Sequence, residues 1–507
     1  MLARSLSIVW WGLKSGFRAS PVQVAYLNDR YSHIIHKRRF SVIWTCQKPR
    51  KSPNNGMATQ LFGTDGIRGK ANEYPITPEI ALRIGQAISR VLRSSGANHN
   101  RVIIGKDTRI SGYMLETALT SGLVSSGMDV FLVGPMPTPA VAHLTKSMGC
   151  GAGIMLTASH NPYEDNGLKI FGPDGFKLSD DLEALVEQEV LYDVKANGVT
   201  GDKIGKAYRI DDARGRYIEF VKQSLGNAHL DGMKIVVDCG HGAGYLLAPL
   251  IFKELGAKVV KLGVDPDGIN INAGVGALYP EFAGKVVKEQ GADVGISLDG
   301  DADRVIFSDA SGATVSGDRI LALCALALKE EGKLSGNSMV CTVMSNLGLH
   351  EAMRKANIGV ITTAVSDRHV IEALRKGGYS FGGENSGHLI FSDYASTGDG
   401  ILSALQVLRF MRKKGATLAD LAAGMREYPQ ALVNLKVKSR IPLVQLNALH
   451  EEIRKADVAF GNAGRHLIRY SGTENKLRIL VEHQDKSEVD RWSQAFKAAV
   501  EADFENL

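Results

Sequence analysis

The feature that most limits how this chain can fold is a repeated alternation of short apolar runs with amphipathic stretches. Short apolar runs predict buried β-strands, and stretches with apolar residues every three or four positions predict helices that cover them. Strand–helix–strand cycles of this kind imply parallel or mixed sheets with helices on their faces. Strands are expected over 101–105, 129–133, 151–156, 234–238, 258–262, 294–298, 338–344 and 359–363, and helices over 113–126, 246–255, 281–290 and 348–355.

The C-terminal part of the chain follows a different pattern, which predicts an α+β unit. Its expected strands are 431–437, 465–470 and 477–481, and its expected helices are 442–456 and 487–501. Because 507 residues exceed what one hydrophobic core supports, we expect several domains. Three α/β domains are placed at 57–205, 206–312 and 313–428, followed by a smaller α+β domain at 429–507.

Residues 1–56 differ from the rest in charge. They hold ten Lys and Arg against one acidic residue, so the remaining 451 residues carry a net charge of −3 although the whole chain carries +6. The segment can be interpreted as a transit peptide, as a nuclear address at His36–Arg39, or as sequence upstream of a native start at Met57. We favour the third interpretation, because a recognisable domain opening follows Met57 closely. The alkaline pI therefore predicts no nucleic-acid partner.

Neither a membrane span nor a disulfide framework is expected. The apolar stretch 5–12 is too short to cross a bilayer, and no other run reaches the ~18 apolar residues that a span needs. The five cysteines are odd in number and form no CxxC pair, which argues against a disulfide framework and a zinc site and favours a reducing cytoplasm. The sequence leaves open whether the protein is a monomer or a homodimer.

The first motif with chemical potential is TASHNP (157–162), directly after the apolar run 151–156. A serine exposed on a strand-to-loop turn can act as a nucleophile or carry a phosphate, and Asn161-Pro162 favours a turn that lifts Ser159 out of the sheet. Taken alone, such a segment would more often be an ordinary serine turn. His160 alone would more often be structural than a general base.

The second motif is DGDADR (299–304), at the end of the expected strand 294–298. Asp299, Asp301 and Asp303 alternate on a glycine-containing loop, and three single carboxylate oxygens suit Mg²⁺ with further oxygens from a phosphate. An EF-hand is excluded because the apolar run 305–308 follows Arg304. A surface turn without a cation is disfavoured, since closely spaced carboxylates repel one another.

Two further loops suit sugar and phosphate binding. In GENSGH (383–388), a carboxylate and a hydroxyl can exchange hydrogen bonds with sugar hydroxyls. In RYSGTEN (469–475), hydroxyls and backbone N–H groups around a glycine form an anion nest, and Arg469 and Arg478 can clamp phosphate oxygens. Each loop alone is also typical of an ordinary polar loop. The segment GHGAG (240–244) lacks the spacing of a dinucleotide site.

Together and in this order, the four motifs resemble those of the α-D-phosphohexomutases. The resemblance runs from about Leu61 to Glu501 and includes FGTDGIRG (62–69), PITP (75–78), GKDTR (105–109) and GPMPTP (134–139). Asn385 matches the members that act on glucosamine phosphates, whereas glucose and mannose mutases usually carry another residue there.

The resemblance implies a heart-shaped molecule of four domains with a central active site. The transferred phosphoryl group would lie among Ser159, Lys169, Arg68, His160 and Arg304. One Mg²⁺ per chain would be held by Ser159, Asp299, Asp301 and Asp303. The substrate would contact Glu384, Ser386, His388, Asp367, Arg368, Arg469, Ser471, Gly472, Thr473 and Arg478.

The implied reaction converts glucosamine 6-phosphate into glucosamine 1-phosphate through a 1,6-bisphosphate, and it starts from phosphorylated Ser159 primed by glucosamine or glucose 1,6-bisphosphate. The partner would be a small phosphosugar, and the product would feed UDP-N-acetylglucosamine and cell-wall precursor synthesis. A phosphomannomutase or phosphoglucomutase of the same family is the nearest alternative. A non-catalytic sugar-phosphate sensor is disfavoured by the intact serine and aspartates.

Four positions depart from the pattern of the family. Ala302 and Ser366 stand where glycine is usual, and Tyr470 and Asn475 each replace a common proline. None of these departures removes an expected ligand or charge.

Overall fold

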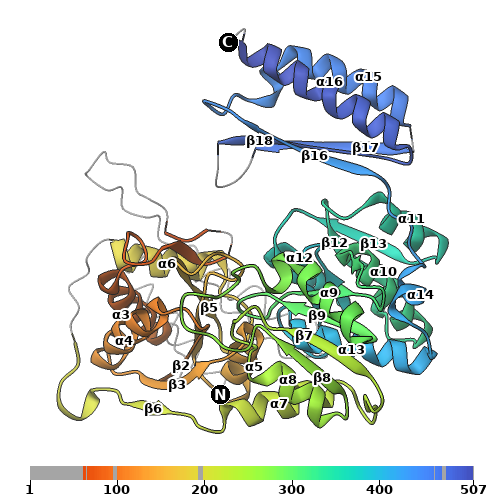
Figure 1. The fold of residues 1–507 in the computed structure, drawn as a ribbon. Coiled ribbons are helices and arrows are strands. Elements are labelled where there is room, and N and C mark those ends of the chain that lie inside the picture. The colour runs from red at the N-terminus through yellow and green to blue at the C-terminus, as the bar shows by residue number, and fades with distance from the viewer. Residues whose placement is uncertain are drawn as a thin grey trace, which may run out of the picture. The chain divides into compact units, whose positions relative to one another are not determined.

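The computed structural model describes residues 61–63, 65–94, 100–191, 198–461, 463–470 and 475–505. The basic segment 1–56 therefore lies outside the described residues. Four sheets follow one another along the described chain (Figure 1). The first three are mixed sheets accompanied by helices, and the last is antiparallel, as the sequence pattern predicts.

The first sheet has six strands in the order β1-β5-β4-β2-β3-β6. Strands β4, β2, β3 and β6 run parallel, whereas β5 is antiparallel to both β4 and β1. The strands are β1 (Ile67–Lys70), β2 (Arg101–Lys106), β3 (Asp129–Pro135), β4 (Ala152–Leu156), β5 (Asp165–Phe171) and β6 (Ala207–Arg209). The helices of this part are α3 (Pro78–Ser94), α4 (Ser111–Ser125), α5 (Thr138–Ser147) and α6 (Asp180–Leu191), and a 3-10 turn spans Gly201–Lys203.

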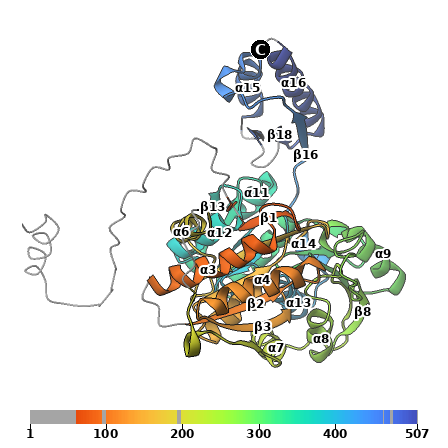
Figure 2. The ribbon, with the colours of Figure 1, turned by 90° about the vertical axis from the view of Figure 1, so that its left-hand side faces the viewer.

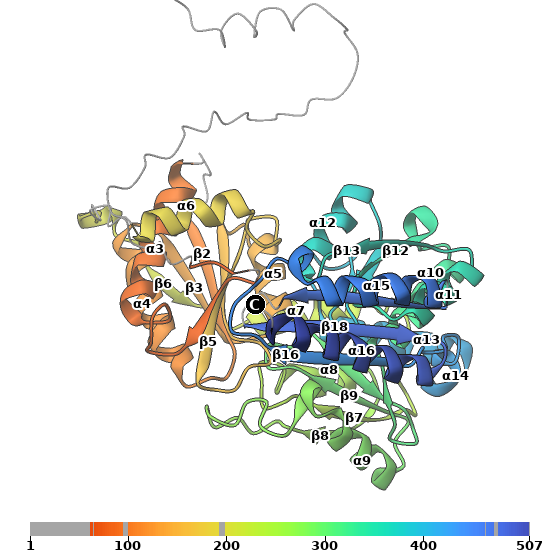
Figure 3. The ribbon, with the colours of Figure 1, turned by 90° about the horizontal axis from the view of Figure 1, so that it is seen from above.

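Helices cover both faces of this sheet because its central strands are apolar on both sides. Val102 and Ile104 of β2 face the cluster that includes α3, α4 and α6, and Ile103 faces the cluster that includes α5. Figure 2 shows α3 and α4 packed side by side, and Figure 3 shows α5 on the other side of the sheet. The continuous apolar run of β2 is therefore typical of a strand buried on both faces.

The second sheet has five strands in the order β11-β10-β9-β7-β8, with β9 between two neighbours. Every residue of β9 is buried, which is why its sequence, VGISL, is almost entirely apolar or small. The strands are β7 (Lys234–Asp238), β8 (Lys258–Leu262), β9 (Val294–Leu298), β10 (Val305–Ser308) and β11 (Thr314–Val315). The helices are α7 (Ala213–Gln223), α8 (Leu247–Glu254) and α9 (Pro280–Gln290), with a 3-10 turn at Gly276–Leu278.

The third sheet has four strands in the order β13-β12-β14-β15. The strands are β12 (Ser338–Thr342), β13 (Gly359–Thr363), β14 (Phe381–Gly383) and β15 (Leu389–Phe391). The helices are α10 (Gly317–Glu330), α11 (Leu347–Lys355), α12 (Asp367–Gly377), α13 (Gly400–Lys414) and α14 (Leu418–Ala422), with a 3-10 turn at Ser335–Asn337. Side chains accept hydrogen bonds at several helix starts, for example Ser316 before α10 and Asp399 before α13.

The C-terminal sheet has three antiparallel strands in the order β16-β18-β17, and α15 and α16 lie on one of its faces (Figure 1). Its side chains form a hydrophobic cluster of their own, which lies entirely within 431–504. The elements are β16 (Gln430–Lys436), a 3-10 turn at Leu443–Gln445, α15 (Asn447–Phe460), β17 (Gly464–Tyr470), β18 (Lys476–His483) and α16 (Lys486–Glu505).

Two sheets include a short strand beyond an expected domain limit. Strand β6 extends the first sheet beyond residue 205, and β11 extends the second beyond 312. The limits at 205, 312 and 428 stay predictions. Among the described residues, no helix combines the length and the apolar character needed to cross a membrane.

Candidate active site

The first component of the site is Ser159, in the turn between β4 and β5. Its backbone adopts the left-handed conformation, with φ of +53°, and the residue is 1% exposed. Its Oγ donates a hydrogen bond of 2.7 Å to Oδ2 of Asp299, which directly follows β9 of the second sheet. The turn directs the hydroxyl toward the carboxylate loop, and Ser159 is buried rather than exposed as its place on a strand-to-loop turn led us to expect.

The second component is the cluster of Asp299, Asp301 and Asp303. One carboxylate oxygen from each lies within 4.8 Å of the others, and all three residues are buried. Within the described residues, Oδ1 of Asp301 and Oδ1 of Asp303 have no hydrogen-bond partner. Buried carboxylate oxygens without a partner carry a large desolvation penalty, which a hard divalent cation would offset. The donor set therefore fits a metal site.

Two side chains from the first domain hold the other oxygens of this cluster. Nζ of Lys169, on β5, lies 2.8 Å from Oδ2 of Asp301 and 2.8 Å from Oδ2 of Asp303. Oγ1 of Thr138, which begins α5, donates to Oδ2 of Asp301 at 2.6 Å. These contacts orient the two carboxylates from one side and leave their Oδ1 atoms facing elsewhere.

The electrostatics of the cluster follow from burial and crowding. Burial, and then the charges of Asp303 and Asp301, hold the pKa of Asp299 well above its ordinary value. Burial also acts to raise the pKa of Asp301, but the charge and the hydrogen bond of Lys169 outweigh it and hold that pKa below the ordinary value. Like charges at this spacing repel strongly unless a cation compensates them.

His160 and Arg304 flank the serine. Nδ1 of His160 lies 3.3 Å from Oγ of Ser159 and 3.3 Å from Nη1 of Arg304. A guanidinium can only donate, so Nδ1 is the acceptor nitrogen of a neutral imidazole. Burial, followed by the charges of Arg304 and Arg68, lowers the pKa of His160 to about 4. His160 therefore contributes a neutral ring, and Arg304 contributes the positive charge.

Arg68 joins the site through a charged network at its edge. Arg68 and Lys177 both form ion pairs with Asp65, and Nζ of Lys169 lies 3.5 Å from Oδ2 of the same carboxylate. Lys177 also pairs with Asp367, at the start of α12 in the third domain. Through Lys169, this network links the aspartate cluster to Asp367, which the sequence analysis assigned to substrate binding.

The GENSGH loop brings unpartnered polar groups to the same region. Glu384 is 8% exposed and His388 is 2% exposed. Nε2 of His388 lies 3.8 Å from Oδ2 of Asp367 and 4.0 Å from Oδ2 of Asp303. Within the described residues, Oγ of Ser386 and both ring nitrogens of His388 have no hydrogen-bond partner. Such groups can form hydrogen bonds with the hydroxyl groups of a ligand.

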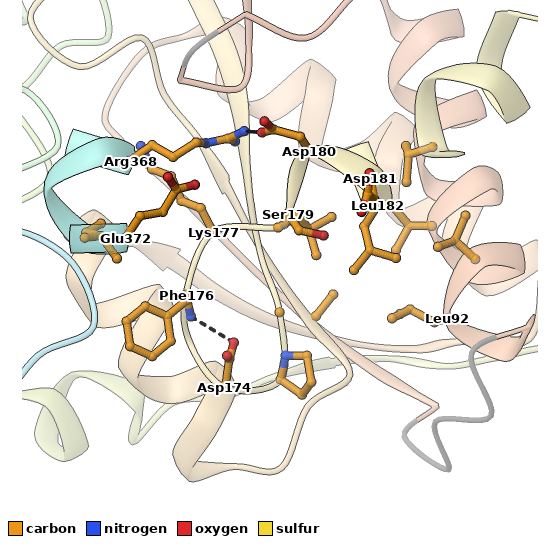
Figure 4. A pocket seen from close by; sticks show the side chains of 18 of the residues that line it. Leu92, Asp174, Phe176, Lys177, Ser179, Asp180, Asp181, Leu182, Arg368 and Glu372 are labelled. Carbon is orange, nitrogen blue, oxygen red and sulfur yellow. Dashed lines mark hydrogen bonds and ion pairs between the residues drawn. The ribbon is translucent and has the colours of Figure 1, made fainter. Parts of the chain in front are cut away.

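Arg368 does not face this network in the structure. Its guanidinium pairs with Asp180 and donates to Oε1 of Glu183 at 2.7 Å, both in the first turn of α6. Arg368 and Asp180 border a cavity of about 730 Å³, which Asp174 and Phe176 also line (Figure 4). Asp367 and Arg368 thus point to different neighbours, although the sequence analysis assigned both to the substrate.

The two arginines of the expected phosphate clamp lie on the C-terminal sheet. Arg469 on β17 and Arg478 on β18 are directly opposite each other in the antiparallel register. Burial, and then the charge of Arg478, lowers the pKa of Arg469. Two guanidinium groups held together in this way suit a dianionic phosphate. Ser471, Gly472 and Thr473 lie outside the described residues.

The departures from the family pattern have a structural expression. Ala302 has φ of +57° and Ser366 has φ of +152°, so both adopt conformations that favour glycine, the residue usual at those positions. Tyr470, in place of a proline, exchanges two hydrogen bonds with the backbone of Ile441 through its hydroxyl group.

Several residues of the site were not singled out from the sequence. Asp65, Arg109 and Thr138 lie within blocks that carry the family resemblance, and attention to the charged and hydroxyl residues of those blocks would have found them. Lys177 and Asn272 gave no signal, because neither belongs to a motif and each reaches the site only through the tertiary fold.

Four protein-family models match successive segments of the chain between residues 59 and 499. Models described as phosphoglucomutase/phosphomannomutase match residues 59–195 (alpha/beta/alpha domain I), 215–312 (alpha/beta/alpha domain II), 316–428 (alpha/beta/alpha domain III) and 432–499 (C-terminal domain).

Curated relatives are similar over nearly their whole length. The chain is 50% identical over 447 residues to the phosphoglucosamine mutase of Syntrophotalea carbinolica, which covers 88% of this chain and 98% of the relative. It is 52% identical over 440 residues to the phosphoglucosamine mutase of Sorangium cellulosum, which covers 86% and 91%. Among solved structures, a phosphoglucomutase/phosphomannomutase family protein of Burkholderia thailandensis has a TM-score of 0.73 at 26% identity, covering 88% of this chain and 97% of that chain.

Proposed function

Since the chain belongs to the phosphoglucomutase/phosphomannomutase family, we propose that it is an enzyme that interconverts glucosamine 6-phosphate and glucosamine 1-phosphate. The substrate class is supported by the 50–52% identical relatives, which are phosphoglucosamine mutases. The reaction type is supported above all by the hydrogen bond from Ser159 Oγ to Asp299, because it joins a buried serine to a cluster that fits a metal.

In the first half-reaction, the phosphoryl group moves from Ser159 to the C1 hydroxyl of glucosamine 6-phosphate. The bond between phosphorus and Oγ breaks, a bond between phosphorus and O1 forms, and the hydroxyl proton replaces the phosphoryl group on Oγ. The 1,6-bisphosphate then turns over in the site. The bond between the second phosphorus and O6 then breaks, that phosphoryl group bonds to Oγ, the Oγ proton passes to O6, and glucosamine 1-phosphate leaves.

The residues around Ser159 match the needs of this transfer. Lys169, Arg304 and Arg68 supply positive charge, and phosphoryl transfer gains most of its rate from positioning and from such charge stabilisation. Asp299, Asp301 and Asp303, together with Ser159, would hold Mg²⁺, which when bound neutralises negative charge on the transferred group. His160 is neutral, so it adds no charge beside the serine, and the positive charge there comes from Lys169, Arg304 and Arg68.

The groups that would bind the sugar and the stationary phosphate lie on the other two domains. Glu384, Ser386 and His388 offer hydrogen bonds to the sugar hydroxyls, and Asp367 orients Lys177 beside them. Arg469 and Arg478 would hold the phosphate that does not react, together with the loop at 471–473. Because the bisphosphate must bind in two orientations, a phosphate clamp on a separate domain suits the reaction.

The function is tested with purified protein in a coupled assay for glucosamine 1-phosphate. Wild type is expected to be active and to carry a fractional phosphate by intact-mass analysis, whereas Ser159→Ala is expected to lose both activity and phosphate without unfolding. Activity retained by Ser159→Ala would contradict the mechanism. Comparing kcat/KM on glucosamine, glucose and mannose 6-phosphates distinguishes the proposed substrate from those of a phosphoglucomutase or phosphomannomutase.

A further inference from the structure

The backbone of Ser159 is held by a closed set of hydrogen bonds within the first domain. The N–H of Ser159 donates to Oγ1 of Thr157 at 2.8 Å, and that hydroxyl donates to Oδ2 of Asp107 at 2.7 Å. The same carboxylate oxygen accepts a hydrogen bond from Nε of Arg109 at 2.9 Å. Nη2 of Arg109 completes the set by donating to the carbonyl oxygen of Ser159 at 2.9 Å.

Arg109 also holds the residues that follow the serine. Its guanidinium donates to the carbonyl oxygens of Asn161, Pro162 and Asp165, so four carbonyls of one loop converge on a single side chain. The side chain of Arg109 is fully buried. This arrangement keeps Ser159 in a left-handed conformation that a non-glycine residue adopts only at a cost in free energy.

A second contact reaches the same carbonyls from the second domain. Nδ2 of Asn272 donates to the carbonyl oxygen of Ser159 at 2.9 Å and to that of Asn161 at 3.1 Å. Because both partners are acceptors, the amide nitrogen must be the group that faces them. Asn272 is 7% exposed, and its own N–H donates to the carbonyl of Gly240, in the loop that follows β7.

The carboxylate loop approaches this contact closely. A Cβ on Gly300 would lie 2.5 Å from the carbonyl oxygen of Ser159 and 2.9 Å from Nδ2 of Asn272. The serine loop, the amide of Asn272 and the aspartate loop are therefore packed together at backbone distance. The position of Ser159 relative to Asp299 is set by contacts across two domains.

We propose that Asn272 is a positioning residue for phosphoryl transfer: its amide, from the second domain, holds the Ser159 carbonyl so that Oγ meets the aspartate cluster in the reactive geometry. This inference rests on the proposed function of Ser159. Arg109 performs the same task from within the first domain, but its loss would leave Asp107 buried without its charge partner. Asn272 can be changed without leaving a buried charge unpaired, so the proposal is tested at this residue.

The test compares three variants of the full-length protein. Asn272→Gly keeps a backbone that suits φ of +59° but removes both hydrogen bonds, and Asn272→Asp keeps the shape but presents an acceptor to two carbonyls. Asn357→Gly is the matched control, because Asn357 is also left-handed, with φ of +51°, and lies exposed at the end of α11.

Because small misplacements of reacting groups cost up to about a hundredfold in rate, Asn272→Gly is expected to lower kcat about tenfold or more. KM for glucosamine 6-phosphate should stay within about twofold, since the contact acts on the serine and not on the sugar. Asn272→Asp should lose more, and Asn357→Gly should match wild type. The rate of single-turnover transfer from ³²P-labelled phospho-Ser159 should fall in proportion to kcat. All rates are measured below the melting temperature of each variant.

Unchanged kcat in Asn272→Gly, a rise in KM alone, or an equal loss in Asn357→Gly would each overturn the proposal. Ser159→Ala measured in parallel separates this failure from failure of the proposed function. If Ser159→Ala is inactive while Asn272→Gly behaves as wild type, only the positioning role falls. If Ser159→Ala remains active, the phosphoserine mechanism itself falls.

Discussion

Two neighbouring residues of the aspartate loop meet opposite steric demands. A Cβ on Gly300 would collide with the backbone of Ser159, whereas Ala302 already has a Cβ in a left-handed conformation that glycine adopts more easily. The close approach of the Ser159 backbone therefore requires glycine at position 300, whereas the left-handed backbone at position 302 favours glycine but also accommodates alanine.

Gly300→Ala should separate the serine and aspartate loops and lower kcat by roughly a hundredfold. Ala302→Gly is the matched change in the same loop. It removes a buried methyl group but relieves the left-handed backbone, two effects of about 1 kcal/mol each, so its free energy of unfolding and its kcat should stay near wild type. Steady-state kinetics and chemical denaturation measure both, and equal losses in the two variants would argue against the close approach as the cause.

The metal assignment is tested at Asp301. Its Oδ1 has no hydrogen-bond partner within the described residues, while Oδ2 is held by Lys169 and Thr138, so Asp301→Asn changes a proposed metal ligand whose position the chain itself fixes. The variant should bind Mg²⁺ more weakly by calorimetry and show reduced kcat. Asp309→Asn, in the turn between β10 and β11, is the control and should change neither.

Chelation extends this prediction to the unmodified protein. EDTA should silence the wild-type enzyme, and added Mg²⁺ should restore it, because three buried carboxylates without a cation repel one another. An enzyme insensitive to EDTA would exclude the metal role of the cluster.

At the scale of elements, the packing of α5 on α7 contains a titratable contact away from the active site. The ring of His143 on α5 stacks on Phe220 of α7, with centroids 3.8 Å apart. Burial, and then the charge of Lys146, lowers the pKa of His143 from 6.5 to about 4. The neutral ring is therefore the form that the folded protein favours.

This shift predicts how stability depends on pH. Between pH 6.5 and 4 the unfolded chain binds a proton at His143 that the folded chain does not, so stability falls as the pH is lowered through this window. Because the ring is partly exposed, the contribution is on the order of 1–2 kcal/mol. His143→Phe keeps a stacked ring but cannot titrate, so its free energy of unfolding should fall less than that of wild type over this range. If the free energies of unfolding of wild type and His143→Phe fall equally over this pH range, His143 does not contribute to the pH dependence of stability.

At the scale of the whole molecule, the serine and the expected phosphate clamp belong to different sheets. The C-terminal sheet is joined to the third domain by polar contacts, including the N–H of Leu347, which donates to Oε1 of Glu482 at 3.2 Å, and Arg465, which donates to the carbonyl of Ser345. Glu482 also accepts a hydrogen bond from Nε of Arg465. From the proposed roles, we expect substitutions on the C-terminal sheet to change substrate binding more than phosphoryl transfer.

Arg469→Ala and Arg478→Ala should each raise KM for glucosamine 6-phosphate more than they lower kcat. A phosphate that does not react is bound alike in the ground state and the transition state, and a charge-assisted hydrogen bond is worth about 1.5–3 kcal/mol, which corresponds to roughly tenfold to a hundredfold in KM. Arg491→Ala, exposed on α16, is the control. If Arg469→Ala lowers the melting temperature and leaves KM unchanged, the clamp assignment is wrong.

The sequence by itself determined the alternation of strands and helices and the positions of the candidate loops. The expected strands 234–238, 258–262, 294–298 and 359–363 match the observed strands residue for residue. Strands β7 and β9 lie inside their sheet and are largely buried and apolar, whereas β8 and β13 are edge strands, are only partly buried and also contain Lys or Thr. The serine and aspartate motifs were recognisable because each follows such a strand, where a loop leaves the sheet. Strands β1 and β5 were not expected, since their sequences mix charged and glycine residues with few apolar ones.

Only the tertiary structure decided which distant residues meet. The contact of Ser159 with Asp299 spans 140 positions, and that of Ser159 with Asn272 spans 113. It also turned Arg368 toward the carboxylates of α6 instead of the aspartate cluster. The pattern of residues along one segment indicates which positions are buried and which backbone conformations they prefer. The partners of a polar side chain depend instead on how separate sheets pack together, and a short stretch of sequence does not specify this packing.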